Sequence, residues 1–211
     1  AFSIKILHYL ELIMLALSRG ARRGHLLAPT PGALLQELYT TDGSGTLISQ
    51  DLYEGLGLAN SSDVSGILEL TEPLVQQGLL RRRTGYEVER ACDQGEMFVW
   101  KRFDNTLGCA SLEHFADAPD RAELGCFVVA ARCRGKGHGQ VFLSYLERVA
   151  FHQGLKILFL LTTQTMQWFI ERGFQEGSLA DLPPSKRSKY DVGRSSKIYV
   201  KQLDALPTDV Q

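Results

Sequence analysis

The sequence predicts an α/β fold, in which a mixed sheet is covered by helices and a truncated α/β segment stands in front of it. Three observations predict this fold. Strand-like apolar runs alternate with segments of helical apolar spacing, a nearly continuous apolar strand at residues 122–129 leads into a glycine-rich turn at 134–139, and a second buried strand follows at 156–162. At 211 residues the chain has room for one complete domain and an appended piece.

The front segment contains only part of an α/β layer. Its predicted elements are a helix at 1–17, a strand at 22–27, a short helix at 33–39 and a glycine-rich loop at 42–46. Because a helix, a strand and a second helix make half a layer and not a domain, we expect residues 1–49 to be the end of a larger α/β domain. Residues 50–60 are then expected to be a linker.

The apolar run at 1–17 predicts a buried helix in preference to a membrane span. It is shorter than the roughly 20 apolar residues that a span needs, and Lys5, His8 and Glu11 interrupt it. A signal peptide is not indicated either, because the run has no basic leader and no small-residue cleavage pattern. Any targeting peptide is expected upstream of this chain.

Residues 61–204 have the pattern of a complete domain, and residues 205–211 read as a tail. The expected helices are from Ser61 to about 70, within 86–92, at 140–152 and at 165–172. The helix at 140–152 is expected to bury Phe142, Tyr145, Leu146 and Val149, and Gly173 is expected to close the helix at 165–172. The expected strands are at 97–100, 107–112, 122–129, 156–162 and 196–203, with a loop at 116–121. The apolar strand at 122–129 is expected to be central in its sheet.

The composition excludes several classes of function. Lysines and arginines (23) balance aspartates and glutamates (24), which gives no electrostatic case for a nucleic acid as partner. The four cysteines, Cys92, Cys109, Cys126 and Cys133, form no CxxC pair and have no histidine at metal-ligand spacing. We therefore expect free thiols, no metal site and a soluble protein in a reducing, intracellular compartment.

The clearest functional mark is the turn Arg134-Gly135-Lys136-Gly137-His138-Gly139. It joins a buried strand to a helix, so several backbone N–H groups meet at a helix N-terminus, where phosphate oxygens are favoured. Its glycines let the backbone approach a phosphate closely. The spacing fits neither GxxxxGK[ST] nor GxGxxG. By itself, the turn is also compatible with a plain tight connection between strand and helix.

Two motifs resemble those of the GCN5-related N-acetyltransferases. The turn after Phe127-Val128-Val129 resembles their R/Q-x-x-G-x-G/A pyrophosphate motif, and residues 168–174 resemble their later helix that ends in Gly-Phe. The resemblance implies acetyl-coenzyme A as co-substrate, in a cleft where the strands at 122–129 and 156–162 splay apart. The implied cofactor-binding residues are Phe127, Val128, Val129, Arg134, Gly135, Lys136, Gly137, His138 and Gly139, with His138 facing solvent.

Nearly the whole chain is similar to the C-terminal half of the N-acetylglutamate synthase family. Residues 72–83, 160–169, 182–187 and 190–197 carry the similarity, and residues 15–46 are similar to the end of the amino-acid-kinase-like domain that precedes the acetyltransferase in that family. The resemblance implies transfer of acetyl to L-glutamate at the head of arginine biosynthesis, by a full-length homo-oligomer. Residues 45–55 are nearest the plant and algal branch, which implies the plastid stroma; otherwise the cytoplasm is expected.

The same resemblance assigns catalytic roles. Glu123 matches the general base of the synthases, which is needed because the α-amine of glutamate is largely ammonium near neutral pH. The alternative is that Glu123 is a solvated residue at a strand edge. The position of the general acid falls on Thr162, because Phe169 stands where many relatives have tyrosine. Water, or departure of the thiolate without an acid, is equally compatible. Backbone N–H groups from residues 127–129 can stabilise the tetrahedral state.

Arg82 or Arg83, together with Arg194, match the arginines that bind glutamate in the family, with Ser196 as a further donor. Arginine suits this role because it binds a carboxylate through two parallel hydrogen bonds. At least one arginine of the run 81–83 is expected to be only solvated. Two other functions stay open: acetyl transfer to a different amine, and a non-catalytic fragment that binds cofactor or regulates.

Overall fold

The computed structural model describes residues 2–40, 43–49, 54–103, 105–163, 165–190, 193 and 196–203. The chain forms two compact units, Ala1–Tyr53 and Glu54–Gln211. The expected tail at 205–211 lies outside the described residues.

The first unit contains two helices and a small sheet. Helix α1 (Phe2–Ser18) precedes strand β1 (Arg23–Leu26), and helix α2 (Ala33–Tyr39) precedes strand β2 (Thr46–Ser49), which pairs antiparallel with β1. Glu37 ties α2 to the turn before β2, because its carboxylate accepts hydrogen bonds from the backbone N–H groups of Ser44 and Gly45. Strand β2 was not among the elements expected from the sequence.

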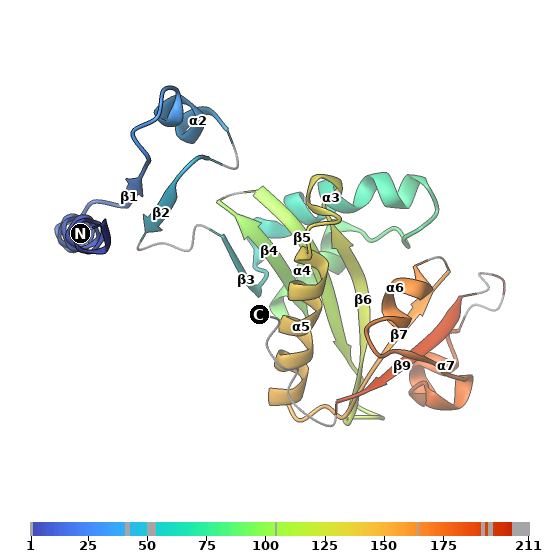
Figure 1. Cartoon of the computed structure of the whole chain (residues 1–211). Coiled ribbons are helices and arrows are strands. Elements are labelled where there is room, and N and C mark those ends of the chain that lie inside the picture. Colours follow the sequence, from blue (N-terminus) through green and yellow to red (C-terminus); the bar gives the residue numbers. More distant parts are fainter. Residues whose placement is uncertain are drawn as a thin grey trace. The chain divides into compact units, whose positions relative to one another are not determined.

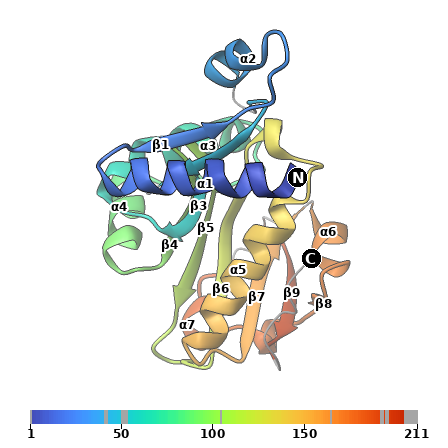
Figure 2. The same ribbon diagram turned by 60° about the vertical axis from the view of Figure 1, so that its left-hand side comes forward.

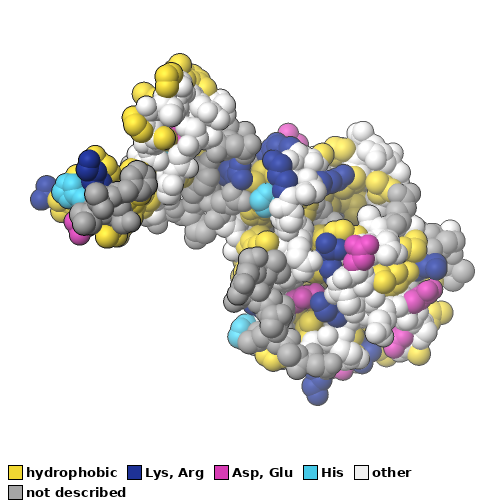
Figure 3. All heavy atoms as spheres, in the orientation of Figure 1, with side chains coloured by type: hydrophobic (Ala, Val, Ile, Leu, Met, Phe, Trp, Pro, Cys, Tyr) yellow, Lys and Arg dark blue, Asp and Glu magenta, His cyan; other side chains and the backbone are white. Residues whose placement is uncertain are grey.

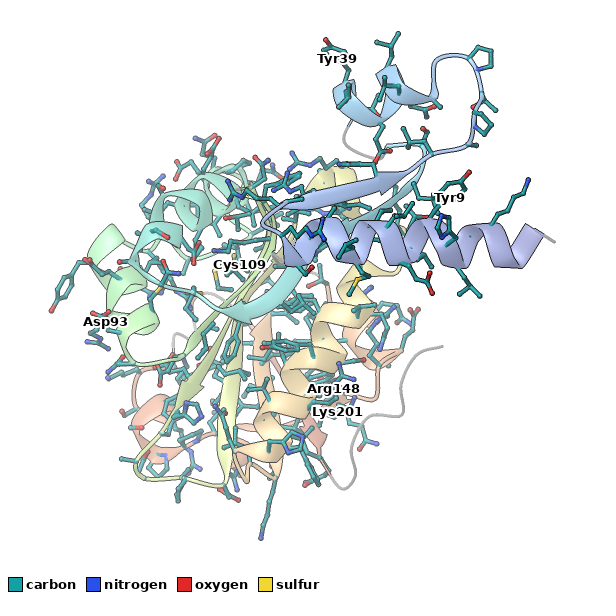
Figure 4. All side chains as sticks on the ribbon, turned by 90° about the vertical axis from the view of Figure 1, so that its left-hand side faces the viewer. Tyr9, Tyr39, Asp93, Cys109, Arg148 and Lys201 are labelled. Carbon is teal, nitrogen blue, oxygen red and sulfur yellow. The ribbon has the colours of Figure 1, made fainter. Side chains whose placement is uncertain are left out.

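Apolar side chains of the first unit are largely exposed. The sequence predicts a buried helix at 1–17, but Leu7 and Met14 of α1 are each 60% exposed, and on α2 Tyr39 is 82% exposed. Yellow surface in Figure 3 and the labelled Tyr9 and Tyr39 in Figure 4 show this. The helix itself is confirmed, and its apolar side chains stay exposed in this unit because two four-residue strands are too small to cover it. No helix in the described ranges has the length and apolar character of a membrane span.

The second unit is built on a seven-stranded sheet in the order β3-β4-β5-β6-β7-β9-β8 (Figure 1; β8 is labelled in Figure 2). Its strands are β3 (Glu54–Leu58), β4 (Met97–Arg102), β5 (Asn105–His114), β6 (Arg121–Val129), β7 (Ile157–Thr162), β8 (Gln175–Glu176) and β9 (Lys197–Gln202). All neighbours pair antiparallel except β6 and β7, which are parallel. The sequence expectation that β6 is central is confirmed.

Helices cover both faces of this sheet. On one face, α3 (Val64–Gln76) and α4 (Gly85–Asp93) pack through Ile67 and Val88 against Met97 and Val99 of β4. On the other face, which is toward the viewer in Figure 2, lies α5 (His138–His152). Its buried side chains include Phe142 and Leu146 and pack with Phe98, Trp100, Ala110, Leu112 and Leu124. Alternation along β4 therefore divides its side chains between two cores.

Strand β6 contains a β-bulge in its second half. Cys109 of β5 pairs with Val128 and Ser111 with Gly125, so two β6 residues, Cys126 and Phe127, lie opposite one on β5. The extra residue reverses the side-chain alternation: Leu124 packs in the core under α5, whereas Val128 packs under α3 and α4. Cys126 adopts a left-handed φ of 49°, unusual for a non-glycine residue.

The expected linker at 50–60 contains strand β3. Its residues 54–58 pair with β4 over five positions, so the second unit begins at Glu54. The pattern Glu-Gly-Leu-Gly-Leu conceals this strand, because β3 is at the sheet edge and its glycines supply no side-chain alternation. The two-residue strand β8 and the short helix α7 (Pro184–Arg187) were also not expected from the sequence.

A buried ion pair joins α5 to β9. Lys201, labelled in Figure 4, reaches α5, where its Nζ atom lies 2.5 Å from Oε1 of Glu147. The Glu147 side chain is 3% exposed and that of Lys201 23%. Because the Glu147 carboxylate is buried, the folded state would be destabilised if the Lys201 ammonium did not pair with its charge.

We expect Lys201→Met to lower the free energy of unfolding by about 3 kcal/mol, the low end for a broken buried pair, because the lysine retains some exposure. The double variant Glu147→Leu/Lys201→Met should recover most of this loss, since no charge is then left unpaired. Guanidinium unfolding of both variants measures the effect. A single variant as stable as the parent protein contradicts the assignment.

Candidate active site

The site lies where β6 and β7 part. Their parallel pairing covers only Arg121, Ala122 and Glu123 of β6, opposite 157–159 of β7. Beyond Glu123 the two strands diverge (Figure 1), and a cavity of about 340 Å³ lies there. The splayed strands expected from the sequence are therefore present.

Five segments line the cavity. They are the stretch before α4, strand β5, strand β6, strand β7 together with α6 (Met166–Ile170), and the segment from α7 to β9. The lining residues with ionisable or hydroxyl side chains are Arg81, Arg83, Glu113, Glu123, Cys126, Thr162, Thr163, Thr165, Lys186, Lys189, Tyr190 and Ser196. The cavity thus combines two carboxylates with several cations, which suits a small zwitterionic or anionic ligand.

Glu123 is the last residue of β6 that pairs with β7, and its side chain is 13% exposed. The alternative that it is a solvated edge residue is therefore wrong. It forms an ion pair with Lys186 and lies opposite Glu113 on β5. Burial raises the pKa of the Glu123 carboxyl above its usual range, and the Lys186 ammonium opposes that rise.

Lys186 is a site residue that the sequence reasoning missed. It belongs to α7, and two hydrogen bonds fix that helix to the β5–β6 loop: the Ser185 N–H and hydroxyl donate to the Asp117 carboxylate at 2.7 and 2.9 Å. The sequence signal was only that residues 182–187 resemble the synthases. No local pattern shows that this helix folds back over β6.

The run 81–83 divides as the sequence reasoning expected. The Arg82 side chain is 66% exposed, does not line the cavity and pairs with Glu72 at 2.8 Å. Arg83 lines the cavity, and its Nη2 atom donates to Ser111 at 3.4 Å. Its buried Nη1 atom has no hydrogen-bond partner among the described residues. A buried guanidinium N–H in this state is suited to a carboxylate ligand, so Arg83 is the candidate and Arg82 is not.

The second predicted arginine, Arg194, lies outside the described residues. Ser196 lines the cavity, and its backbone carbonyl accepts a hydrogen bond from the hydroxyl of Tyr190. This contact joins the segment after α7 to the start of β9. Ser196 therefore lies at the cavity wall, and its role as a donor to the substrate stays a prediction.

The turn at 134–139 has the geometry needed to hold a pyrophosphate. Gly135 and Gly137 have φ values of 76° and 80°, which side chains rarely adopt, and Gly137 immediately precedes α5. The Nε atom of Arg134 donates to the Val129 carbonyl at 3.0 Å, which ties the turn to the end of β6. A Cβ on Gly139 would lie 3.2 Å from Trp168. The turn fits the cofactor's pyrophosphate, because its residues 134–137 are exposed and it leads into the N-terminus of a 15-residue helix, where phosphate is favoured.

His138 differs from its prediction. It was expected to face solvent, but it is half-buried and its ring lies 4.7 Å from that of Trp100, centroid to centroid. Lys136 of the same turn is exposed. The aromatic surface of β4 explains the difference, because it offers His138 a ring to pack on.

The other predicted residues flank the divergence. Phe127 lines the cavity and packs on Phe142 and Trp168, with ring centroids 5.5 Å apart in each case, while Val128 and Val129 are buried. Thr162, at the end of β7, lines the opposite wall, and its hydroxyl lies 3.3 Å from that of Thr165. Neither threonine hydroxyl is a strong acid, so the assignment of Thr162 as the general acid stays a prediction.

Cys126 occupies the bulge and lines the cavity. A hydrogen bond from the buried Cys109 thiol, assisted by the Arg83 guanidinium, lowers the pKa of the Cys126 thiol to about 7, against the opposing effect of burial. The pKa of Cys109 is raised correspondingly. All four cysteines are free thiols. Within the described ranges, no group of three or more His, Cys, Asp or Glu side chains is arranged to hold a metal ion.

Comparison with known proteins agrees with this geometry. Residues 68–174 match the model of the Acetyltransferase (GNAT) family. The chain belongs to this family. The match begins in α3 and ends at Phe174, just before β8, and so includes the bulge, the cavity strands and the turn before α5.

The curated relatives that match this chain are named amino-acid acetyltransferases. The chain is 42% identical over 185 residues to an amino-acid acetyltransferase of Pseudomonas fluorescens and, with the same figures, to one of Azotobacter vinelandii; each alignment covers 87% of this chain and 42% of the relative. The chain thus spans about two fifths of the length of these curated relatives. Both are bacterial, and they do not support the expected likeness to the plant and algal branch.

Two solved structures of N-acetylglutamate synthase from Neisseria gonorrhoeae are similar over 92% of this chain, at 35% identity. One is a complex with coenzyme A and N-acetyl-glutamate, with a TM-score of 0.68 and 45% of that protein covered. The other is a complex with coenzyme A and L-arginine, with a TM-score of 0.76 and 43% covered. The acetyltransferase fold expected from the sequence is confirmed.

We expect iodoacetamide to label Cys126 with a pH midpoint near 7, because the thiolate is the reactive form. Replacing its hydrogen-bond donor, in Cys109→Ala, should move the midpoint upward, toward the ordinary value of about 8.5. Mass spectrometry of the Cys126 peptide follows the reaction. Cys92, whose pKa is raised by burial, serves as the internal control and should label more slowly at pH 7. An unchanged midpoint in Cys109→Ala contradicts this account.

Proposed function

We propose that this chain is the acetyltransferase region of an N-acetylglutamate synthase, which transfers acetyl from acetyl-coenzyme A to the α-amine of L-glutamate, the first step of arginine biosynthesis. The observation that carries the proposal is the buried Glu123 in a cavity that also contains Arg83, beside a turn suited to pyrophosphate. The Neisseria structures, with coenzyme A and N-acetyl-glutamate or L-arginine bound, support it.

In this proposal the chemistry begins with a proton transfer. The ammonium of glutamate must lose a proton before its nitrogen can attack the thioester carbon, and Glu123 accepts that proton directly or through one water. The raised pKa of Glu123 suits this role, because a base is most effective when its pKa is near the working pH. The two electrons of the amine then form the C–N bond.

The tetrahedral state places negative charge on the former carbonyl oxygen. The bulge turns the β6 backbone at Cys126 and Phe127 out of regular pairing with β5, beside the cavity. Backbone N–H groups of residues 127–129 are our candidates for stabilising that charge. Collapse of this state breaks the C–S bond, and the departing thiolate takes a proton from water or from a hydroxyl such as that of Thr162.

Glutamate also carries two carboxylates, and cations at the cavity explain their selection. Arg83 supplies an unpaired guanidinium N–H to one of them, with Arg194 and Ser196 proposed for the other. The assembly of the whole protein, and an amino-acid-kinase-like origin of residues 1–49, remain predictions. The bacterial relatives favour the cytoplasm over a plastid as the location.

We expect the isolated chain to bind acetyl-coenzyme A, and Gly137→Ala to weaken that binding at least tenfold, because φ 80° is strained for alanine and the turn must shift. Gly154→Ala is the matched control: Gly154 has the same φ of 80° and lies past the other end of α5. Both variants should lose similar stability, but only Gly137→Ala should lose affinity in calorimetry. Equal affinities would refute the role of the turn.

The function is tested by thiol release from acetyl-coenzyme A with a panel of amino acids. We expect L-glutamate to be the preferred acceptor, and Arg83→Met and Arg194→Ala each to raise its KM at least tenfold, since a lost charged hydrogen bond is worth roughly 1.5–3 kcal/mol. Arg82→Met should behave as the parent protein. Preference for an acceptor without a carboxylate would indicate a different amine substrate, and binding without turnover would indicate a non-catalytic fragment.

A further inference from the structure

Glu123 and Lys186 form an ion pair inside the cavity, between segments far apart in the sequence. The carboxylate side chain is 13% exposed and the lysine side chain 25%, and both line the cavity wall. Ion pairs on the protein surface contribute little to stability, so they do not fix a lysine in one position. This pair is mostly removed from water, so each charge depends on the other.

The position of Lys186 is set by its neighbours. Before it, Ser185 is bound twice to the Asp117 carboxylate, as described above. After it, the Arg187 guanidinium donates to the backbone carbonyls of Ala180 and Leu182 at 3.0 and 3.1 Å. These contacts hold both flanks of a four-residue helix, and they place its one inward-facing lysine against β6.

Other charged groups around the cavity do not replace this lysine. Glu113 lies directly opposite Glu123 on β5, and the second carboxylate raises the pKa of the first. Arg83 lowers that pKa, but less than Lys186 does. The remaining titratable residues of the lining are Arg81, which pairs with Glu87, and Cys126, Lys189 and Tyr190. β7 contributes only apolar and threonine side chains to the described lining.

We propose that Lys186 is a positioning residue for the general base: it holds the buried Glu123 carboxylate ionised and fixed at the cavity wall until the acceptor amine arrives. The inference rests on the proposed function. Without Lys186, burial and Glu113 both favour the neutral acid, which cannot accept a proton. Lys186 itself transfers no proton and forms no bond to the acetyl group.

The test compares Lys186→Met with Lys186→Arg and Lys189→Met in the pH dependence of kcat/KM for glutamate. The acid limb of this profile reports the base in the free enzyme. Removing a cation next to a carboxylate raises its pKa by roughly 1–3 units, so the limb of Lys186→Met should move to higher pH by at least one unit. Its activity below the limb should therefore fall at least tenfold and recover at high pH.

The two other variants separate a specific contact from loss of charge. Lys186→Arg keeps the cation and should keep the position of the limb. Lys189→Met removes a cation from the same cavity wall, and its limb should shift by less than half as much as that of Lys186→Met. Circular dichroism and acetyl-coenzyme A affinity show that each variant is folded. A limb that stays in place in Lys186→Met overturns the proposal.

A second readout does not depend on turnover. The Glu123 carboxyl carbon, labelled with ¹³C and assigned by its loss in Glu123→Gln, can be titrated by NMR in the parent protein and in Lys186→Met. An upward shift of its midpoint in Lys186→Met shows that Lys186 keeps the carboxylate ionised, whichever amine the chain acetylates. Equal midpoints reject it. Lack of glutamate turnover in the parent protein would reject the proposed function alone.

Discussion

The site depends on the short pairing of β6 with β7. Three residues of β6 pair with three of β7, and then the strands separate. A regular parallel pair would fill the space with backbone hydrogen bonds and leave no cavity. β7 remains paired along its whole length with β9, so its separation from β6 does not leave it without support. The sheet can therefore open at its centre because its outer pairs are complete.

The bulge in β6 is the second feature on which the site depends. It reverses the alternation of the strand, so the residues before it and after it serve different cores. Helix α5 connects β6 to β7, and its buried side chains cover one face of the sheet. The turn before α5 lies at the end of β6, where Arg134 donates a hydrogen bond to the Val129 carbonyl. One helix thus contributes both to stability and to the proposed cofactor site.

Much of this fold could be predicted from the sequence, because β4 to β7 and α3 to α5 have clear periodicity and the glycine turn has a distinctive pattern. What could not be predicted depends on distant contacts. β3 contains two glycines and is defined only by its pairing with β4. The choice of Arg83 over Arg82 depends on which way each side chain points. Lys186 reaches Glu123 only because a loop 68 residues earlier in the chain, at Asp117, holds α7. The left-handed backbone at Cys126 could not be predicted either, because the residue there is not a glycine.

The Asp117–Ser185 contact has a further consequence, for motion. It is the described link between α7 and the β5–β6 loop, and it is exposed, whereas the sheet beneath it is held by a buried core. Because exposed hydrogen bonds help to hold α7, its local stability is expected to be lower than that of the sheet. The hydrogen bonds from Ser185 lower the pKa of the Asp117 carboxyl. The contact is therefore formed at neutral pH and weakens only as acidification protonates the aspartate.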